Sequence, residues 1–194
     1  DGLLAFRFNG WGGKYEASAD DAVAALLGDW LGVTPRVHDL VCEGGALEVN
    51  SQGVLLANQG CAVDRRRNPR KDCGDVQESL CKALGVTRFA WLSGICLTSD
   101  DTDGHIDTLV RFAADDVVIY TGRNPDHPDA LVLDHLHEQV SALATKEGWR
   151  AIELPTPIVH SELDGRLLPA TYANFLICND AVFLPIYGVT QDGL

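Results

Sequence analysis

The sequence contains no methionine, no long apolar run and few basic residues. A membrane-spanning helix needs about 20 consecutive apolar residues, so we expect no membrane partner. The formal net charge of −13 argues against nucleic acid as a partner, because phosphate binding requires a basic surface. The missing methionine and the abrupt opening at Asp1-Gly2-Leu3-Leu4 predict an internal piece of a longer protein, in which the lack of a targeting signal carries no information.

The chain also lacks a Cys-x-x-Cys pair, which argues against a structural zinc site. Scattered cysteines in a chain of this size favour free thiols in a reducing compartment over a disulfide framework. We therefore expect a cytoplasmic protein. The six cysteines are Cys42, Cys61, Cys73, Cys81, Cys96 and Cys178.

The composition is that of a globular chain, with 194 residues, of which 46% are hydrophobic and 22% charged. Hydrophobic periodicity and turn residues predict both strands and helices, with Asp20 or Asp21 as the N-cap of the first helix. The predicted strands are Leu3–Phe8, Arg36–Val41, Ala46–Asn50, Val54–Asn58, Thr87–Leu92, Thr108–Phe112, Val117–Tyr120, Arg150–Leu154, Tyr172–Cys178 and Ala181–Ile186. The predicted helices are Asp20–Leu31, Asp75–Leu84 and Pro128–Lys146.

These elements recur in the order strand, strand, helix, strand. The hairpin turns centre on Gln52, Asp115 and Asn179-Asp180, which are 63 to 65 residues apart. Such units cannot each bury a core alone and must pack side by side. We predict an α/β fold, a single incomplete domain over 1–194, in which repeated units surround a central site. The predicted units are about 1–42, 43–104, 105–168 and a partial 169–194.

The stretch Asp100–Asp107 carries the most chemistry, with four aspartates, a glycine and a histidine directly before a predicted strand. His105 and Asp107 are two residues apart, which places both side chains on one face of an extended chain. Glu43 precedes the first strand of the previous unit, 62 residues before His105. Equivalent positions in units around an axis converge, so we expect Glu43, His105 and Asp107 to meet. Carboxylates suit a planar guanidinium cation, and histidine suits general acid–base catalysis.

Other sites fit this stretch less well. A calcium loop with Gly104 at its sixth position would have Val110, which is no ligand, at its twelfth. A zinc site at His105 and Asp107 has no second histidine at a suitable spacing. The basic loop Arg65–Lys71 is short, and we expect it to cap carbonyls or pair with carboxylates locally. We therefore predict no metal site.

Several motifs, in the same order along the chain, resemble a known family. They are Phe8–Tyr15 (Phe-Asn-Gly-Trp-Gly-Gly-Lys-Tyr), Glu43-Gly44-Gly45, Arg67-Asn68-Pro69, Trp91-Leu92, Asp100–Asp107 and Leu168–Phe175. The chain resembles the agmatine deiminases and bacterial-type peptidylarginine deiminases of the guanidino-group-modifying, or pentein, superfamily. The resemblance implies a partial α/β propeller, five-bladed when complete.

The resemblance also implies hydrolysis of agmatine to N-carbamoylputrescine and ammonia, a step of putrescine and polyamine biosynthesis. A cysteine attacks the guanidinium carbon, and water cleaves the resulting thiouronium. By motif, His105 is the general acid and base, Asp107 binds the guanidinium, and Glu43 orients the histidine or helps to hold substrate. Asp101, Asp103 and Trp11 complete the expected substrate contacts. No metal and no cofactor are implied.

Two family motifs have no match in this chain, a Trp-x-Arg-Asp-x-Gly-Pro motif and the glycine-rich motif with the nucleophilic cysteine. Cys42 lies beside Glu43 and Cys96 precedes the histidine loop, but neither matches, so we expect no nucleophile here and an inactive chain. The expected partner is a small cationic guanidine, and a homo-oligomer is one form open to the full-length parent. The alternatives are a peptidylarginine or arginine deiminase, or a non-catalytic guanidine-binding propeller.

Overall fold

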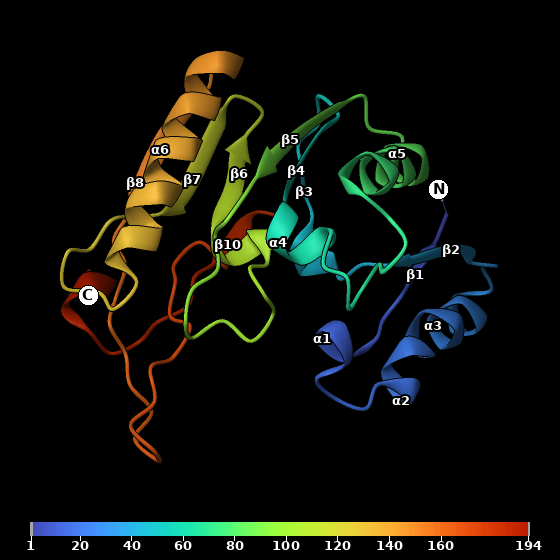
Figure 1. Ribbon diagram of the computed structural model, residues 1–194, viewed down its shortest axis with the longest axis horizontal. Coiled ribbons are helices and arrows are strands. Elements are labelled where there is room, and N and C mark those ends of the chain that lie inside the picture. The colour runs from blue at the N-terminus through green and yellow to red at the C-terminus, as the bar shows by residue number, and fades with distance from the viewer. Residues whose placement is uncertain (1, 194) are drawn as a thin grey trace.

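The first complete unit of the fold consists of three strands and a crossover helix (Figure 1). The computed structural model describes residues 2–193. Strands β3 (Glu48–Val49) and β4 (Val54–Asn58) form an antiparallel hairpin, and β5 (Arg88–Leu92) pairs parallel with β4. The parallel pairing requires a crossover, which α5 (Cys73–Leu84) supplies.

The second unit repeats this order. Strands β6 (Val110–Ala114) and β7 (Val117–Thr121) form the hairpin, α6 (Ala130–Glu147) is the crossover, and β8 (Arg150–Leu154) pairs parallel with β7. The sequence repeat is therefore a structural repeat, and the predicted α/β propeller class is confirmed.

Hydrogen bonds at nearly constant sequence separation join neighbouring units. Glu48 accepts from the Phe112 backbone N–H at 2.8 Å across 64 residues, and Asn50 donates to the Asp115 carbonyl at 3.0 Å across 65. Arg111 then donates to the Phe175 carbonyl at 2.9 Å, again across 64 residues. Side chains at equivalent positions, Glu48 and Arg111, thus contact the backbone of the following unit, although one accepts and the other donates.

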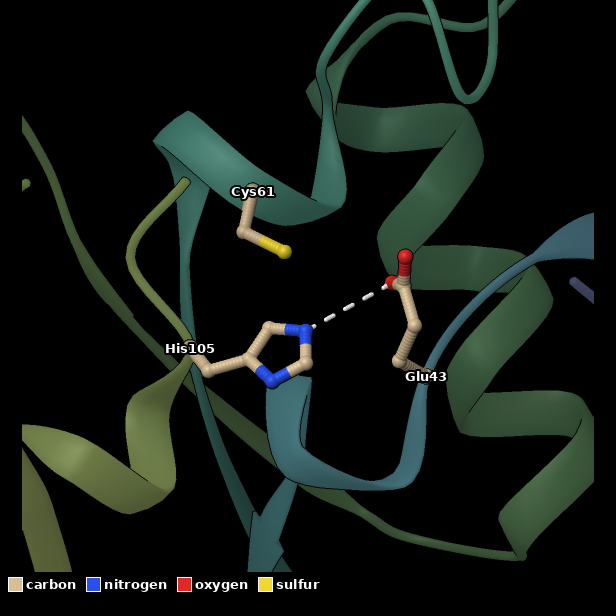
Figure 2. Close-up of side chains that lie close together, drawn as sticks. All are labelled: Glu43, Cys61 and His105. Carbon is tan, nitrogen blue, oxygen red and sulfur yellow. Dashed lines mark ion pairs between the residues drawn. The ribbon is translucent and has the colours of Figure 1, made fainter. Parts of the chain in front are cut away.

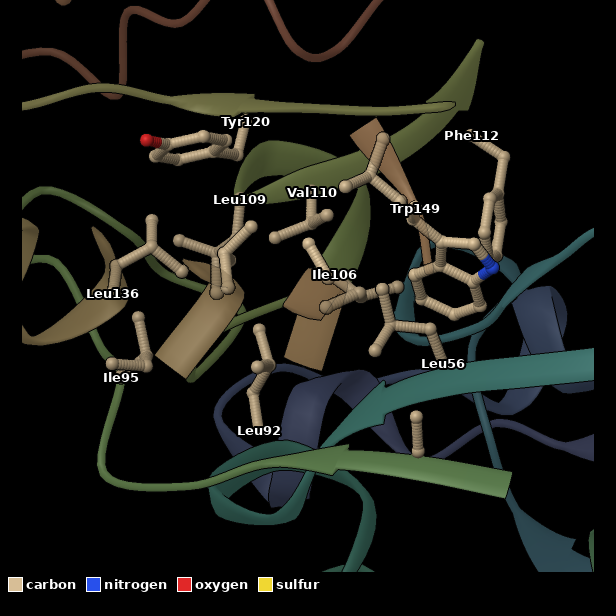
Figure 3. Close-up of a cluster of buried hydrophobic side chains, with 14 of the residues drawn as sticks. Leu56, Leu92, Ile95, Ile106, Leu109, Val110, Phe112, Tyr120, Leu136 and Trp149 are labelled. Atoms are coloured by element: carbon tan, nitrogen blue, oxygen red, sulfur yellow. The ribbon is translucent and has the colours of Figure 1, made fainter. Parts of the chain in front are cut away.

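The core lies between units, because each crossover helix packs between two sheets. Leu56 and Leu92 of the first unit and Leu136 of α6 belong to one buried cluster (Figure 3). Leu55, the neighbour of Leu56 on β4, points to the opposite face and packs with Leu80 of α5 in a second cluster. Strand β4 is therefore buried on both faces, as is usual for a strand covered on both sides.

The remaining elements flank these units. Strands β1 and β2 pair parallel, and helix α3 packs against β1 (Figure 1). These elements are β1 (Leu4–Arg7), α1 (Gly10–Gly13), α2 (Ser18–Asp21), α3 (Val23–Leu31), β2 (Arg36–Val41), α4 (Gln59–Ala62), β9 (Leu176–Cys178), β10 (Ala181–Phe183), and the 3₁₀ turns η1 (Gly44–Ala46), η2 (Ile106–Thr108) and η3 (Thr190–Asp192).

Several predicted boundaries were wrong, and three differ most clearly from the structure. The first helix is broken into α2 and α3, and Asp21 does not cap it, because its carboxylate accepts from the Phe8 backbone N–H at 2.7 Å and from Arg7. Helix α5 starts earlier than predicted, because Asp72 and Asp75 form a capping box. The third hairpin has only three residues in each strand, and its apolar side chains are exposed. Within residues 2–193, no helix is long and apolar enough to cross a membrane.

Candidate active site

Two equivalent 3₁₀ turns form the centre of the site, one at the start of each complete unit. Glu43 is the N-cap of η1, and His105 is the N-cap of η2. The turns contact each other, and the His105 Nε2 atom lies 3.8 Å from the Glu43 Oε2 atom (Figure 2). Both residues are buried. The repeat therefore brings Glu43 and His105 together, as the sequence predicted.

Asp107 lies at the same centre, against the backbone of Gly45. A Cβ atom on Gly45 would lie 2.5 Å from Asp107 Oδ2 and 2.6 Å from His105 Nδ1, closer than real Cβ atoms approach other atoms. The backbone of η1 thus lies directly against both side chains, and only glycine leaves the space. Two of the predicted catalytic residues therefore contact the turn that the third, Glu43, caps.

Asn58, at the carboxyl end of β4, positions the backbone that leads to His105. Its side-chain amide donates to the Ile95 carbonyl at 2.6 Å and to the Gly104 carbonyl at 2.8 Å. Gly104 has a φ of +91°, and a Cβ there would lie 2.4 Å from the Asn58 amide nitrogen, so this close approach also requires glycine. Sequence reasoning missed Asn58 because its partners are 37 and 46 residues away.

Arg67 fixes the carboxylate of Glu43. Its fully buried side chain donates through Nε to Glu43 Oε1 at 2.8 Å and through Nη1 to Asp103 Oδ2 at 2.8 Å. Burial raises the pKa of Glu43, but His105 and the Arg67 guanidinium outweigh burial and lower the pKa overall. Glu43 is thus an oriented, ionised carboxylate. The prediction that the basic loop pairs with carboxylates is confirmed, although its link to Glu43 was not foreseen.

Asp103 ties three cations to the acidic loop. Lys14 and Arg66 each lie 3.0 Å from Oδ1, while Arg67 occupies Oδ2. Burial raises the pKa of Asp103, and the hydrogen bonds from Arg67, Lys14 and Arg66 outweigh burial and bring the pKa down to about 2. Both Asp103 oxygens therefore already have cationic partners within the protein.

The loop Phe8–Tyr15 lies against the acidic loop. The Tyr15 hydroxyl donates to Asp101 Oδ2 at 2.8 Å, and Lys14 donates to the Asp101 carbonyl at 2.6 Å. Trp11 has a φ of 55°, which is unusual for a bulky residue, and its ring packs edge-on against Phe8 and Tyr15. The predicted substrate-binding residues Trp11, Asp101 and Asp103 thus belong to two loops that hold each other.

Two buried polar atoms of the site have no partner. Within residues 2–193, His105 Nε2 and Asp107 Oδ1 are buried and form no hydrogen bond. Burial raises the pKa of Asp107 above its usual range. Buried polar groups in native proteins almost always have partners, so these two atoms are candidates for contact with a bound ligand or water. An acceptor oxygen beside a ring nitrogen suits a ligand rich in N–H groups.

Cys61 is the cysteine nearest this centre. It lies on α4, and its sulfur and the ligand atoms of Glu43 and His105 are all within 4.8 Å of one another (Figure 2). Burial raises the pKa of the Cys61 thiol to about 12, which favours the thiol over the nucleophilic thiolate. Sequence reasoning missed Cys61 because no local spacing links it to the other two residues.

The repeated strand-strand-helix-strand units around a polar centre define a partial α/β propeller. Residues 1–193 match the model of one family with this architecture, the Porphyromonas-type peptidyl-arginine deiminases, and the chain belongs to that family.

Relatives at about 30% identity carry related names. A Vibrio parahaemolyticus protein provisionally named agmatine deiminase is 31% identical over 98% of this chain and 59% of its own length. A structure of C. jejuni agmatine deiminase with substrate bound superposes with a TM-score of 0.90 at 31% identity, covering 100% of this chain and 58% of that one. A Porphyromonas gingivalis structure provisionally named arginine deiminase has a TM-score of 0.89 at 36% identity, covering 97% and 57%. The chain thus spans a little under three fifths of these relatives.

Proposed function

We propose that the protein containing this chain hydrolyses a guanidine to a urea with release of ammonia, and that agmatine is its substrate. The observation that carries the proposal is the pair of unpartnered buried atoms, Asp107 Oδ1 and His105 Nε2, beside the ionised carboxylate of Glu43. A guanidinium ion offers the planar N–H donors and the positive charge that these groups lack. The agmatine deiminase names of the relatives support the choice of substrate.

In this proposal each central residue has one role. Asp107 accepts hydrogen bonds from the guanidinium, and its carboxylate, whose burial is unfavourable without a cation, becomes paired on binding. His105 gives a proton to the departing ammonia and then takes one from the water that cleaves the thiouronium. Glu43, held by Arg67, stabilises the protonated imidazole.

The nucleophile is a cysteine thiolate, which forms a carbon–sulfur bond as the carbon–nitrogen bond to ammonia breaks. Cys61 does not fit this role, since it is held as a thiol. We propose that the nucleophile comes from a part of the protein outside these 194 residues.

The surrounding residues have supporting roles. Both Asp103 oxygens are paired with Lys14, Arg66 and Arg67, so we propose that Asp103 holds the acidic loop and does not contact the substrate. Trp11 and Asp101 remain candidates for the substrate contact, on the two loops that are bonded to each other. We place the reaction in the cytoplasm because all six cysteines are free thiols. We place it in polyamine synthesis because agmatine is the proposed substrate.

Ammonia release by the full-length protein tests the proposal. We expect faster release from agmatine than from arginine or a peptidyl-arginine, with N-carbamoylputrescine as the product by mass spectrometry. Equal or greater activity on peptides would favour the peptidylarginine alternative. No ammonia from any of the three substrates would favour a non-catalytic guanidine-binding protein.

A further inference from the structure

We propose that Glu43, Cys61 and His105 form a binding site for a thiophilic divalent cation, with Zn²⁺ as the ion that fits best. The three side chains come from three separate segments and point toward one another (Figure 2). They offer a thiol sulfur, an imidazole nitrogen and a carboxylate oxygen, which is the ligand set that zinc prefers in proteins.

The spacing of the ligand atoms is close to that of a zinc site. Tetrahedral zinc with these bond lengths separates its ligand atoms by about 3.5 Å. His105 Nε2 and Glu43 Oε2 are 3.8 Å apart, and the three ligand atoms all lie within 4.8 Å of one another. Shifts of about an ångström would therefore bring the three atoms to zinc-binding distances.

The imidazole nitrogen of His105 is available for a metal. Nε2 is buried and has no hydrogen-bond partner in the described part of the chain, and the His105 side chain is 10% exposed. A cysteine alone would not indicate a site, but an unpaired buried nitrogen that faces both the sulfur and the carboxylate does.

Arg67 donates to both oxygens of Glu43, and a metal would replace the longer of the two hydrogen bonds. The Arg67 Nε atom lies 2.8 Å from Oε1 and 3.2 Å from Oε2, and Oε2 is also the oxygen nearer His105. A metal that takes Oε2 therefore leaves the shorter hydrogen bond to Oε1 intact. As the sulfur–zinc bond forms, the Cys61 thiol releases its proton to the buffer, and thiolate and carboxylate balance the charge of Zn²⁺.

Cobalt provides a direct test, since Co²⁺ occupies zinc sites and its bond to a thiolate gives a charge-transfer absorption in the near ultraviolet. The experiment uses the 194-residue chain in which the two exposed cysteines are replaced, Cys96→Ser and Cys178→Ser. We expect one equivalent of Co²⁺ to produce this band and one equivalent of Zn²⁺ to remove it. No thiolate band with excess Co²⁺ would overturn the proposal.

Three variants in that background identify the ligands. Cys61→Ser should abolish the thiolate band, and His105→Asn should weaken Zn²⁺ binding at least tenfold. Cys81→Ser, a partly buried cysteine on α5 outside the cluster, should leave both unchanged. Circular dichroism without metal checks that each variant folds. A band that survives Cys61→Ser or disappears in Cys81→Ser would contradict the assignment.

The site shares His105 and Glu43 with the proposed reaction, so zinc should inhibit ammonia release by the full-length protein, a consequence that rests on the proposed function. The cobalt spectrum does not depend on activity. A thiolate band in a protein without deiminase activity would support the metal site and contradict only the proposed function. An active protein without the band would contradict only the metal site.

Discussion

Glu43 and His105 occupy the same position in two repeated units, but their side chains differ in whether they have hydrogen-bond partners. Each is the N-cap of a 3₁₀ turn that leads into the first strand of its unit. The carboxylate of Glu43 is held by the buried Arg67, whereas His105 Nε2 and the nearby Asp107 Oδ1 have no partner within residues 2–193. One backbone arrangement thus supplies a fixed charge from one unit and free binding atoms from the next.

The difference shows how a repeat becomes a site. Identical units would place identical groups at the centre, and like charges would repel. Here the first unit provides an ion pair that stabilises the centre, and the second provides groups that a ligand can satisfy. This difference between the units would not hold if His105 and Asp107 proved to be structural, or if the pair of Glu43 and Arg67 proved to be dispensable.

The largest effect is expected for His105. In the full-length protein, His105→Ala should lower the rate of ammonia release by about 10²–10⁴-fold, because a general acid contributes about that much to catalysis. The substitution also removes a buried imidazole that lowers the pKa of Glu43, so some loss of stability is expected and the rate is measured well below the melting temperature of the variant. The matched control is His135→Ala on the exposed face of α6. Retention of half the rate would remove His105 from the mechanism.

A large loss of stability is expected for Arg67. Arg67→Met should cost about 3–5 kcal/mol in the free energy of unfolding, because it leaves the buried Glu43 carboxylate without its partner. Urea denaturation of the chain measures this cost. Arg65→Met, an exposed arginine two residues away, should stay within about 0.5 kcal/mol of the parent. Equal costs for the two variants would show that the ion pair does not hold the centre.

A smaller effect is expected where the two turns touch. The added methyl group of Gly45→Ala collides with Asp107 Oδ2 and His105 Nδ1, and overpacking of this kind costs about 1–3 kcal/mol. We expect a clear fall in the rate of agmatine hydrolysis in a variant that still folds, since the collision displaces the side chains of Asp107 and His105. Gly74→Ala, in the first turn of α5, meets only one atom, at 3.3 Å, and serves as the control. Unchanged activity in Gly45→Ala would contradict the close approach.

Replacement of the two carboxylates, Glu43 and Asp107, is expected to change thermal stability with opposite signs in the two units. The pKa of Glu43 is lowered in the folded protein, so its charge contributes stability above the unfolded pKa, a contribution lost as the pH falls through the folded pKa. The pKa of Asp107 is raised, so its ionised form costs stability once the pH rises through the folded pKa.

At neutral pH, with a chelator present, Glu43→Gln should therefore lower the melting temperature, and Asp107→Asn should leave it unchanged or raise it slightly. Differential scanning calorimetry of the two variants measures both shifts. Equal destabilisation by the two substitutions would mean that Asp107 is as firmly held as Glu43.

Most of the fold could be predicted from the sequence, because the strands and crossover helices carry strong periodic signals. The repeat then predicted that Glu43 and His105 converge. The early start of α5 has a local cause, the capping box of Asp72 and Asp75, but other errors have tertiary causes. Asp21 resembles a helix cap, but it binds Arg7 and Phe8, 14 and 13 residues away. Asn58, Arg67 and Cys61 were missed as members of the site for the same reason, since each lies near the centre only in the folded chain.

Agmatine binding by Asp107→Asn is the most direct test of the central claim, that the free groups of the second unit recognise a guanidinium ion. Isothermal titration calorimetry compares the parent and the variant at full length, each with the nucleophilic cysteine replaced by serine so that agmatine is bound and not hydrolysed. Loss of one charge-assisted hydrogen bond costs about 1.5–3 kcal/mol, so the affinity should fall by about 10–150-fold without loss of thermal stability. An unchanged affinity, or a loss of affinity only in parallel with a loss of folding, would contradict the account.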